Sequence, residues 1–319
     1  MRQVTGHKTQ DTRHRAQDTG HKTRVFSLPA TLRSLHPEAL TRSILCSLFP
    51  ILSLILSGCS VNRMAVRATA SVIDTGLPAV YRERDPQFAR EALPANLKLM
   101  EILLESDPGN QTLLVDAAMG FCGYGFMFIE DESETRASAL YEKGGAYALK
   151  ALALRGVVED GLVSPRALDK NSAPAAFWHT FCRAAYVNLN RDDPDALAEL
   201  PKIMPVAERV AELTPSYYYN GAYAMLGTYY ALRPKILGGD PVKAKLNFDK
   251  ALEGAGSDFL LNSYMAAKMY GVAAQDQDFF ENALNAILAA ELKDDGARLP
   301  NEVARIKARK LLEKKNELF

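Results

Sequence analysis

The sequence predicts an all-α fold, an α-solenoid in which helix pairs stack on one another. The clearest pair lies between residues 219 and 252, where large and small residues recur at spacings typical of one helix face. They are Tyr223, Leu226, Gly227 and Tyr230 in the first helix, and Ala244, Phe248 and Ala251 in the second. Beyond residue 60, no stretch shows the alternating pattern of a strand.

This pair predicts a degenerate tetratricopeptide-like unit, in which two antiparallel helices nest through small-against-large contacts. Gly227 would let the second helix approach closely, and Phe248 would fill the groove beside it. The loop 233–239 makes the unit about five residues too long for a regular repeat. We therefore expect four degenerate helix pairs with flanking helices, which together form one domain over residues 59–319.

The other elements follow in chain order. A first helix is expected at 61–72, and Asp85-Pro86 opens a second that ends at the stop-and-restart signal 107–110. Further helical faces are expected around 114–121, 137–152, 178–185, 197–213, 264–271 and 280–287. The acidic run 130–132 is expected to be a solvated loop. The last helix, 301–312, is expected to be a solvated cap, because a solenoid needs a polar end.

The charge distribution argues against nucleic-acid binding. The net charge of the whole chain is zero, but residues 1–58 hold 8 Lys/Arg against 3 Asp/Glu. The remainder is therefore mildly acidic, whereas nucleic acid requires a basic face.

Residues 1–58 differ from the rest of the chain. Residues 1–32 repeat the string Thr-Gly-His-Lys-Thr and hold few apolar residues, so we expect a disordered or mis-annotated extension. Residues 33–58 join a basic flank, an apolar core and small residues, the pattern of an export signal. The core is too short for a membrane span, which takes roughly 20 residues.

The end of this signal carries a more specific pattern. Leu56-Ser57-Gly58-Cys59 resembles the bacterial lipoprotein box, in which the cysteine thiol is acylated. We therefore expect a lipoprotein signal peptide over 33–58 and a periplasmic protein that is anchored to the membrane through Cys59. An ordinary signal peptide or a short membrane anchor is the alternative.

Catalytic motifs are missing from the sequence after Cys59. It contains one histidine, His179, and none of the common hydrolase, zinc or dithiol motifs. We expect a non-enzyme with no catalytic residue, cofactor or metal, and we interpret His179 as a packed helix residue. Cys122 and Cys182 are expected to be buried free thiols. A disulfide between them would require Cα atoms within about 7 Å.

A binding face can be placed by aligning the first helices of the four pairs. The residues expected to face the concave side are Val115, Met119, Cys122, His179, Arg183, Tyr186, Ala224, Thr228, Ala231, Met265, Met269 and Val272. This set is largely apolar and rich in methionine, which favours a hydrophobic small molecule of irregular shape. Alternatively, a flanking helix fills the groove and these residues form ordinary core.

Several strings together are similar to one known family. They are the lipoprotein cysteine followed by Val61-Asn62-Arg63; Phe88-Ala89-Arg90-Glu91-Ala92-Leu93-Pro94; Leu140-Tyr141 with Tyr147-Ala148-Leu149; Leu226-Gly227-x-x-Tyr230 with Leu237-Gly238-Gly239-Asp240-Pro241; and Asn301-Glu302-Val303-Ala304. Over about residues 53–314, the chain resembles the TatT component family of TRAP-type transporter systems.

The resemblance implies a periplasmic lipoprotein of cryptic tetratricopeptide repeats that forms a homotrimer with a pore through each protomer. It also implies a partnership with the periplasmic solute-binding component of a TRAP transporter, and it suggests hydrophobic solutes. The repetitive residues 1–32 depart from the family pattern.

Three functions remain open at this point. The first is an accessory component that docks a solute-binding protein and binds or passes a hydrophobic solute. The second is a structural scaffold for envelope protein assembly, which predicts a groove filled by the chain's own helices. The third, an enzyme that uses His179 and Arg183, has the least support from the sequence.

Overall fold

A computed structural model describes residues 63–293 and 296–319. All the described residues belong to one compact unit, which spans residues 59–319. The extension at 1–32, the signal peptide at 33–58 and the lipidation site Cys59 lie outside the described residues and stay predictions.

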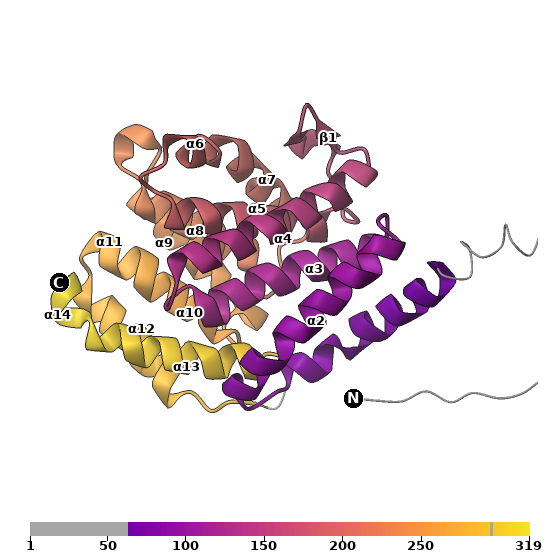
Figure 1. Ribbon diagram of the computed structural model, residues 1–319. Helices are drawn as coiled ribbons and strands as arrows, with labels where there is room; N and C mark the ends of the chain where they lie inside the picture. Colours follow the sequence, from indigo (N-terminus) through magenta and orange to yellow (C-terminus); the bar gives the residue numbers. More distant parts are fainter. Residues whose placement is uncertain (1–62, 294–295) are drawn as a thin grey trace, which may run out of the picture. The chain divides into compact units, whose positions relative to one another are not determined.

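The all-α class is confirmed, since the described residues are mostly helical (Figure 1). After a helical stretch at 63–81, the α-helices are α2 (Pro86–Ser106), α3 (Gln111–Tyr124), α4 (Glu134–Leu154), α5 (Ala173–Leu189), α6 (Pro194–Leu197), α7 (Leu200–Leu213), α8 (Gly221–Leu232), α9 (Pro241–Ala251), α10 (Leu260–Met265), α11 (Val272–Ala274), α12 (Gln277–Ala289), α13 (Arg298–Glu313) and α14 (Lys315–Leu318). Two π-helical turns are η2 (Gly125–Ile129) and η6 (Ala266–Gly271); the 3₁₀ turns are η3 (Pro165–Ala167), η4 (Lys235–Leu237) and η5 (Gly254–Gly256).

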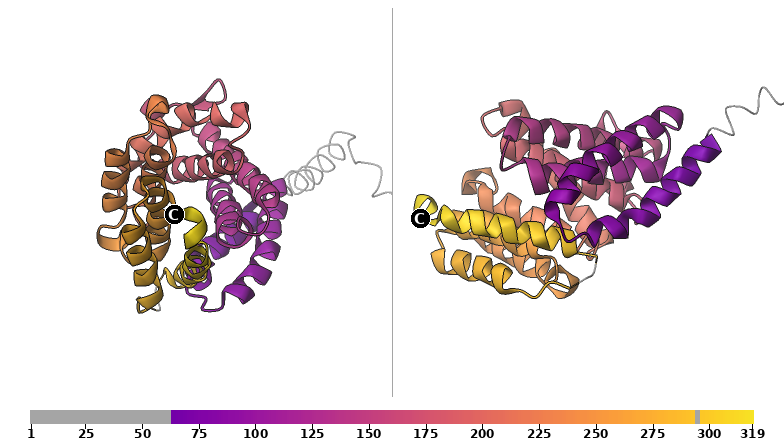
Figure 2. Two further views of the ribbon diagram at one scale, coloured as in Figure 1. Left: turned by 90° about the vertical axis from the view of Figure 1, so that its left-hand side faces the viewer. Right: turned by 60° about the horizontal axis from the view of Figure 1, so that its bottom comes forward.

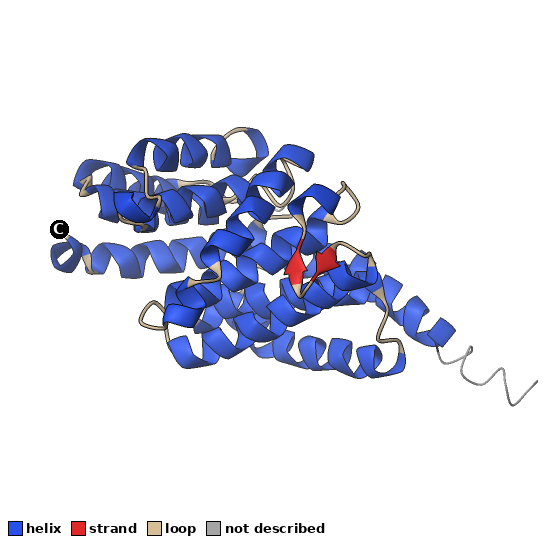
Figure 3. Ribbon diagram, turned by 90° about the horizontal axis from the view of Figure 1, so that it is seen from above, coloured by secondary structure: helices blue, strands red, loops and turns tan. Residues whose placement is uncertain are grey.

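One small sheet contradicts the expectation of no strands. β1 (Val158–Glu159) pairs antiparallel with β2 (Leu162–Val163), as Figure 3 shows. The two residues between them, Asp160 and Gly161, both have positive φ, at 50° and 78°. An Asp-Gly pair favours this tight hairpin turn. The turn residues of the hairpin can therefore be recognised in the sequence, but strands of two residues are too short to show a periodic pattern.

Helix starts follow the capping residues. The Asp85 carboxylate accepts hydrogen bonds from the backbone N–H groups of Gln87 and Phe88, and Pro86 occupies the first turn of α2. Asn110 caps α3 in the same way through the N–H of Leu113. Because these side chains satisfy N–H groups that the helix leaves unpaired, the predicted helix opening at Asp85-Pro86 and the restart after 107–110 are confirmed.

The core is centred on α3. Figure 1 shows α3 between α2 and α4, and it also contacts α5. The helical run Gln111–Ile129 is long and apolar enough to cross a membrane by composition alone, yet most of its residues are buried by neighbouring helices. Leu113, Leu114, Ala117 and Ala118 are fully buried. This burial is that of a core helix.

The expectation of free thiols is wrong. Cys122 on α3 and Cys182 on α5 form a disulfide, with an S–S distance of 2.02 Å and a Cα–Cα distance of 5.6 Å. Gly144 on α4 lies against this bond, and an added Cβ there would collide with the Cys122 Sγ. The lack of a side chain at Gly144 lets α4 approach the linked helices. Sequence spacing could not show that α3 and α5 would meet.

Helices that are neighbours in the chain pack on one another from α3 through α9. The predicted nesting of α8 and α9 is confirmed, because a Cβ added at Gly227 would lie 2.8 Å from the Phe248 ring. The α-solenoid of degenerate tetratricopeptide-like pairs stays a prediction. In a solenoid each repeat contacts only its neighbours, whereas α13 contacts α2 as well as α10 and α12.

The C-terminal helix α13 is not the solvated cap that the sequence predicts. Both views in Figure 2 place it beside the N-terminal helices of the described unit. Its buried residues are Leu299, Pro300, Asn301, Val303, Ala304, Lys307, Ala308 and Leu311. Basic residues spread around the helix suggested solvation. However, Lys307 is only 3% exposed, and it pairs with the carboxylate of Asp131 from a distant segment.

Candidate functional site

One cavity among the described residues has a volume of about 480 Å³, and we call it the main cavity. Helices α5, α7 and α8 form its walls, together with the two π-helical turns and the segments around 191–198 and 233–237. Most of the lining is apolar. Four methionines contribute to it: Met204, Met225, Met265 and Met269.

Both π-helical turns border the main cavity. η2 contributes Phe126 and is followed directly by Glu130, and η6 contributes Met269. A π-turn inserts an extra residue into a helix and redirects the side chains around it, and such turns occur frequently at functional sites. The irregular backbone is therefore concentrated where the cavity lies.

A charge cluster that includes the buried Glu130 and Lys307 stands at one side of the main cavity. Glu130 lines the cavity and accepts a hydrogen bond of 2.5 Å from the Tyr141 hydroxyl and one of 3.3 Å from Lys268 Nζ. The adjacent Asp131 accepts a 2.6 Å hydrogen bond from Lys307 Nζ. The expectation of a solvated acidic run is therefore wrong for Glu130, which is buried, whereas Asp131 and Glu132 are exposed as predicted. A buried carboxylate such as Glu130 requires a partner, and Lys268 on η6 supplies it.

Opposite charges and an aromatic ring stabilise the charged side chains of this cluster. Burial opposes ionisation of Asp131, but the charge and hydrogen bond of Lys307 outweigh it and lower the pKa of that carboxyl. Burial, together with Glu130, raises the pKa of Tyr141 well above its usual value. The Lys307 ammonium also lies 5.1 Å from the centre of the Phe126 ring, a cation–π contact. The cluster thus forms a polar region beside the apolar walls of the main cavity.

The predicted lining residues are divided among different places. Thr228, Met265 and Met269 line the main cavity. Met119 lines a second, smaller cavity near α2 and α3. Cys122 is fully buried in the disulfide, and the partly buried Val115 packs against the core. Most of the main cavity comes instead from residues that the repeat register did not indicate.

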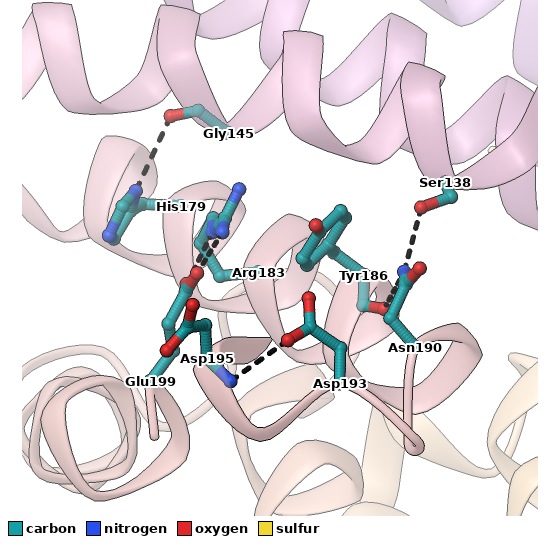
Figure 4. A network of polar contacts seen from close by, with 9 residues as sticks. All are labelled: Ser138, Gly145, His179, Arg183, Tyr186, Asn190, Asp193, Asp195 and Glu199. Atoms are coloured by element: carbon teal, nitrogen blue, oxygen red, sulfur yellow. Dashed lines mark hydrogen bonds and ion pairs between the residues drawn. The ribbon is translucent and has the colours of Figure 1, made fainter. Parts of the chain in front are cut away.

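Three other candidates, His179, Arg183 and Tyr186, form a structural network (Figure 4). His179 Nδ1 lies 3.4 Å from the Gly145 carbonyl oxygen, and burial lowers the pKa of this imidazole to about 4. Arg183 donates from Nε to Glu199 at 2.6 Å, and its guanidinium lies 4.5 Å from the Tyr186 ring centre. These contacts hold α5 against α4 and against the segment before α7.

Neither Arg183 nor His179 lines the main cavity or the second one. Within residues 63–293 and 296–319, no group of three His, Cys, Asp or Glu side chains is placed to hold a metal ion. The main cavity thus offers space, apolar surface and a few polar groups, which suits binding of a small molecule.

A family model for the TRAP transporter T-component matches residues 82–319, more than half of the chain. The chain therefore belongs to this family, and the resemblance inferred from the sequence is confirmed. The family assigns it an accessory role in a TRAP transport system. No curated protein matches the sequence.

Proposed function

We propose that this member of the T-component family holds a hydrophobic solute in its main cavity and exchanges it with the solute-binding protein of its transport system. The observation that carries the proposal is the cavity of about 480 Å³ with four methionines in its lining. This size is typical of small-molecule sites. Flexible, polarizable thioethers adapt to apolar ligands of irregular shape.

The polar residues of the cavity lining would orient the solute. Glu130, Asn188, Arg191, Thr228 and Arg233 are polar residues of the lining, and the remaining wall is aliphatic, aromatic or thioether. A mostly apolar cavity with few polar groups binds by surface burial and uses the polar groups for orientation. The class of solute that fits is therefore a largely apolar molecule with a limited number of polar substituents.

We also propose that the protein acts in the periplasm, tethered by acylated Cys59. The export signal at 33–58 and the lipoprotein-like string before Cys59 support this placement. The Cys122–Cys182 disulfide supports it independently, because disulfides persist in oxidising compartments and are rare in the cytosol. The homotrimer that the resemblance implies is retained as part of the proposal.

We propose that the solute-binding protein docks beside the main cavity on four exposed apolar residues, which we call the rim patch: Ile236, Leu237, Val242 and Leu246. Ile236 is 93% exposed, and the other three are also exposed. Leu237 lines the cavity, and Val242 and Leu246 lie one turn apart on α9. Exposed apolar surface of this kind is typical of protein interaction sites. A solute-binding protein seated there would cover the cavity edge.

Solute binding can be tested with the hydrophobic dye N-phenyl-1-naphthylamine and the chain expressed from Ser60. Ala184 lines the main cavity, so Ala184→Trp should fill it and weaken dye binding at least tenfold. Ala286, exposed on α12 and outside both cavities, provides the matched control Ala286→Trp. Equal dye binding by wild type and Ala184→Trp, with both folded, would contradict the proposal.

Docking requires a separate test. Ile236→Asp should abolish co-purification of the solute-binding protein encoded with this chain, whereas Ile102→Asp, at an exposed α2 residue away from the main cavity, should not. Retained co-purification with Ile236→Asp would exclude the rim patch. A protein that docks its partner but binds no dye would instead support the scaffold alternative.

A further inference from the structure

A second cavity of about 230 Å³ lies between the helical stretch 63–81, α2 and α3. Its walls are mainly aliphatic and thioether, with three tyrosines, Tyr81, Tyr124 and Tyr218. None of the described residues that line it is Lys, Arg or His. It shares no lining residue with the main cavity.

One acidic side chain stands in this apolar wall. Asp116 on α3 is only 5% exposed and lines the second cavity. Its Oδ2 atom is buried and has no hydrogen-bond partner among the described residues. A buried polar atom without a partner carries the full cost of its lost hydration. In folded proteins such an atom therefore requires an explanation.

The neighbouring tyrosines do not satisfy this carboxyl. The Tyr81 hydroxyl lies 3.2 Å from the Tyr218 hydroxyl and 3.3 Å from Met119 Sδ, so these groups interact with one another. Asp74, on the helical stretch 63–81, acts on Asp116, and Tyr217 and Tyr219 act on the Tyr81–Tyr218 pair. Burial first, and then the like charge of Asp74, raise the pKa of Asp116 to about 7. One acid and three tyrosines thus line a space to which the described lining residues bring no cation.

We propose that the second cavity binds the protonated amine of a small, otherwise apolar molecule, with Asp116 as its counter-ion. An ammonium group would donate to the orphaned Oδ2 atom. It would also lie close to aromatic faces, which attract cations. The aliphatic and methionine walls would take up the hydrocarbon part of the molecule. This site is separate from the main cavity and independent of the function proposed for it.

Calorimetric titration of the full chain in phospholipid nanodiscs, with empty nanodiscs subtracted, tests this assignment. The probes are cyclohexylammonium and its neutral counterpart cyclohexanol. At pH 8 the amine should bind wild type at least tenfold more tightly than the alcohol. The amine affinity should fall as pH drops below 7 and the carboxyl takes up a proton, while the alcohol affinity should stay constant.

Asp116→Asn keeps the shape of the side chain and removes its charge, so it should abolish the preference for the amine. Ala184→Trp, which fills the main cavity, should leave amine binding unchanged. Equal affinity of wild type for the two probes would overturn the assignment, and this result does not depend on any variant folding. A folded Asp116→Asn variant that keeps the preference would overturn it as well.

Discussion

Removal of the Cys122–Cys182 disulfide should destabilise the protein strongly. The bond closes a loop with a sequence separation of 60 residues and links α3 to α5 across Gly144 of α4. Both cysteines are fully buried. The double substitution Cys122→Ala and Cys182→Ala removes the link without leaving a polar group in the core.

The magnitude follows from the length of the loop. A cross-link restricts the unfolded chain, and in the chain-entropy model a loop of this size contributes about 4 kcal/mol of stability. Loss of two buried sulfur atoms adds a packing cost of about 1 kcal/mol. We therefore expect the double variant to lose about 4 to 5 kcal/mol of unfolding free energy.

Urea denaturation of the chain expressed from Ser60 measures this loss. Cys122 and Cys182 are the only cysteines in that segment, so a reducing agent should destabilise wild type and leave the double variant unchanged. If wild type shows the same unfolding free energy with and without reductant, or if mass spectrometry finds two free thiols, the reasoning is refuted.

Three further predictions concern the buried groups. Lys307→Met should lower the free energy of unfolding by about 2 to 3 kcal/mol in the same urea titration, because it leaves its partly exposed partner Asp131 without a cation. The control Lys310→Met, at an exposed position on the same helix, should lower it by less than about 0.5 kcal/mol. Gly144→Ala should lower the free energy of unfolding by about 1 to 3 kcal/mol, because the added methyl group would clash with the disulfide. The control Gly123→Ala, whose added methyl group would meet no neighbouring atom, should be neutral or slightly stabilising in thermal unfolding. Because the folded pKa of Asp116, about 7, exceeds its unfolded value, ionisation of this buried carboxyl costs stability as pH rises from about 4 to 7. Asp116→Asn should therefore match wild type near pH 4 and exceed it by about 4 kcal/mol at pH 8. A constant difference in unfolding free energy across this range would contradict the assignment.

Features that depend on near neighbours in the chain could be predicted from the sequence. Asp85 and Asn110 start helices because a capping side chain acts within a few residues. The nesting of Gly227 against Phe248 also followed from spacing, since consecutive helices pack on each other. The same register placed Met265 and Met269 at the main cavity.

Features that depend on the path of the whole chain could not be predicted. The pair of Asp131 with Lys307 joins residues 176 positions apart, and no local pattern links them. Glu130 and the basic α13 each resembled solvated surface when taken alone, but Glu130 and Lys307 are buried. The second cavity likewise requires three helices to meet around Asp116, a carboxyl with no distinguishing sequence context.

The central claim is that the main cavity holds a hydrophobic solute. Native mass spectrometry of the protein purified from its own cell envelope tests it most directly. The account predicts an apolar small molecule bound to wild type and to Ala286→Trp, and its loss from Ala184→Trp. Wild-type protein without a bound small molecule would contradict it, and so would a bound molecule that Ala184→Trp retains.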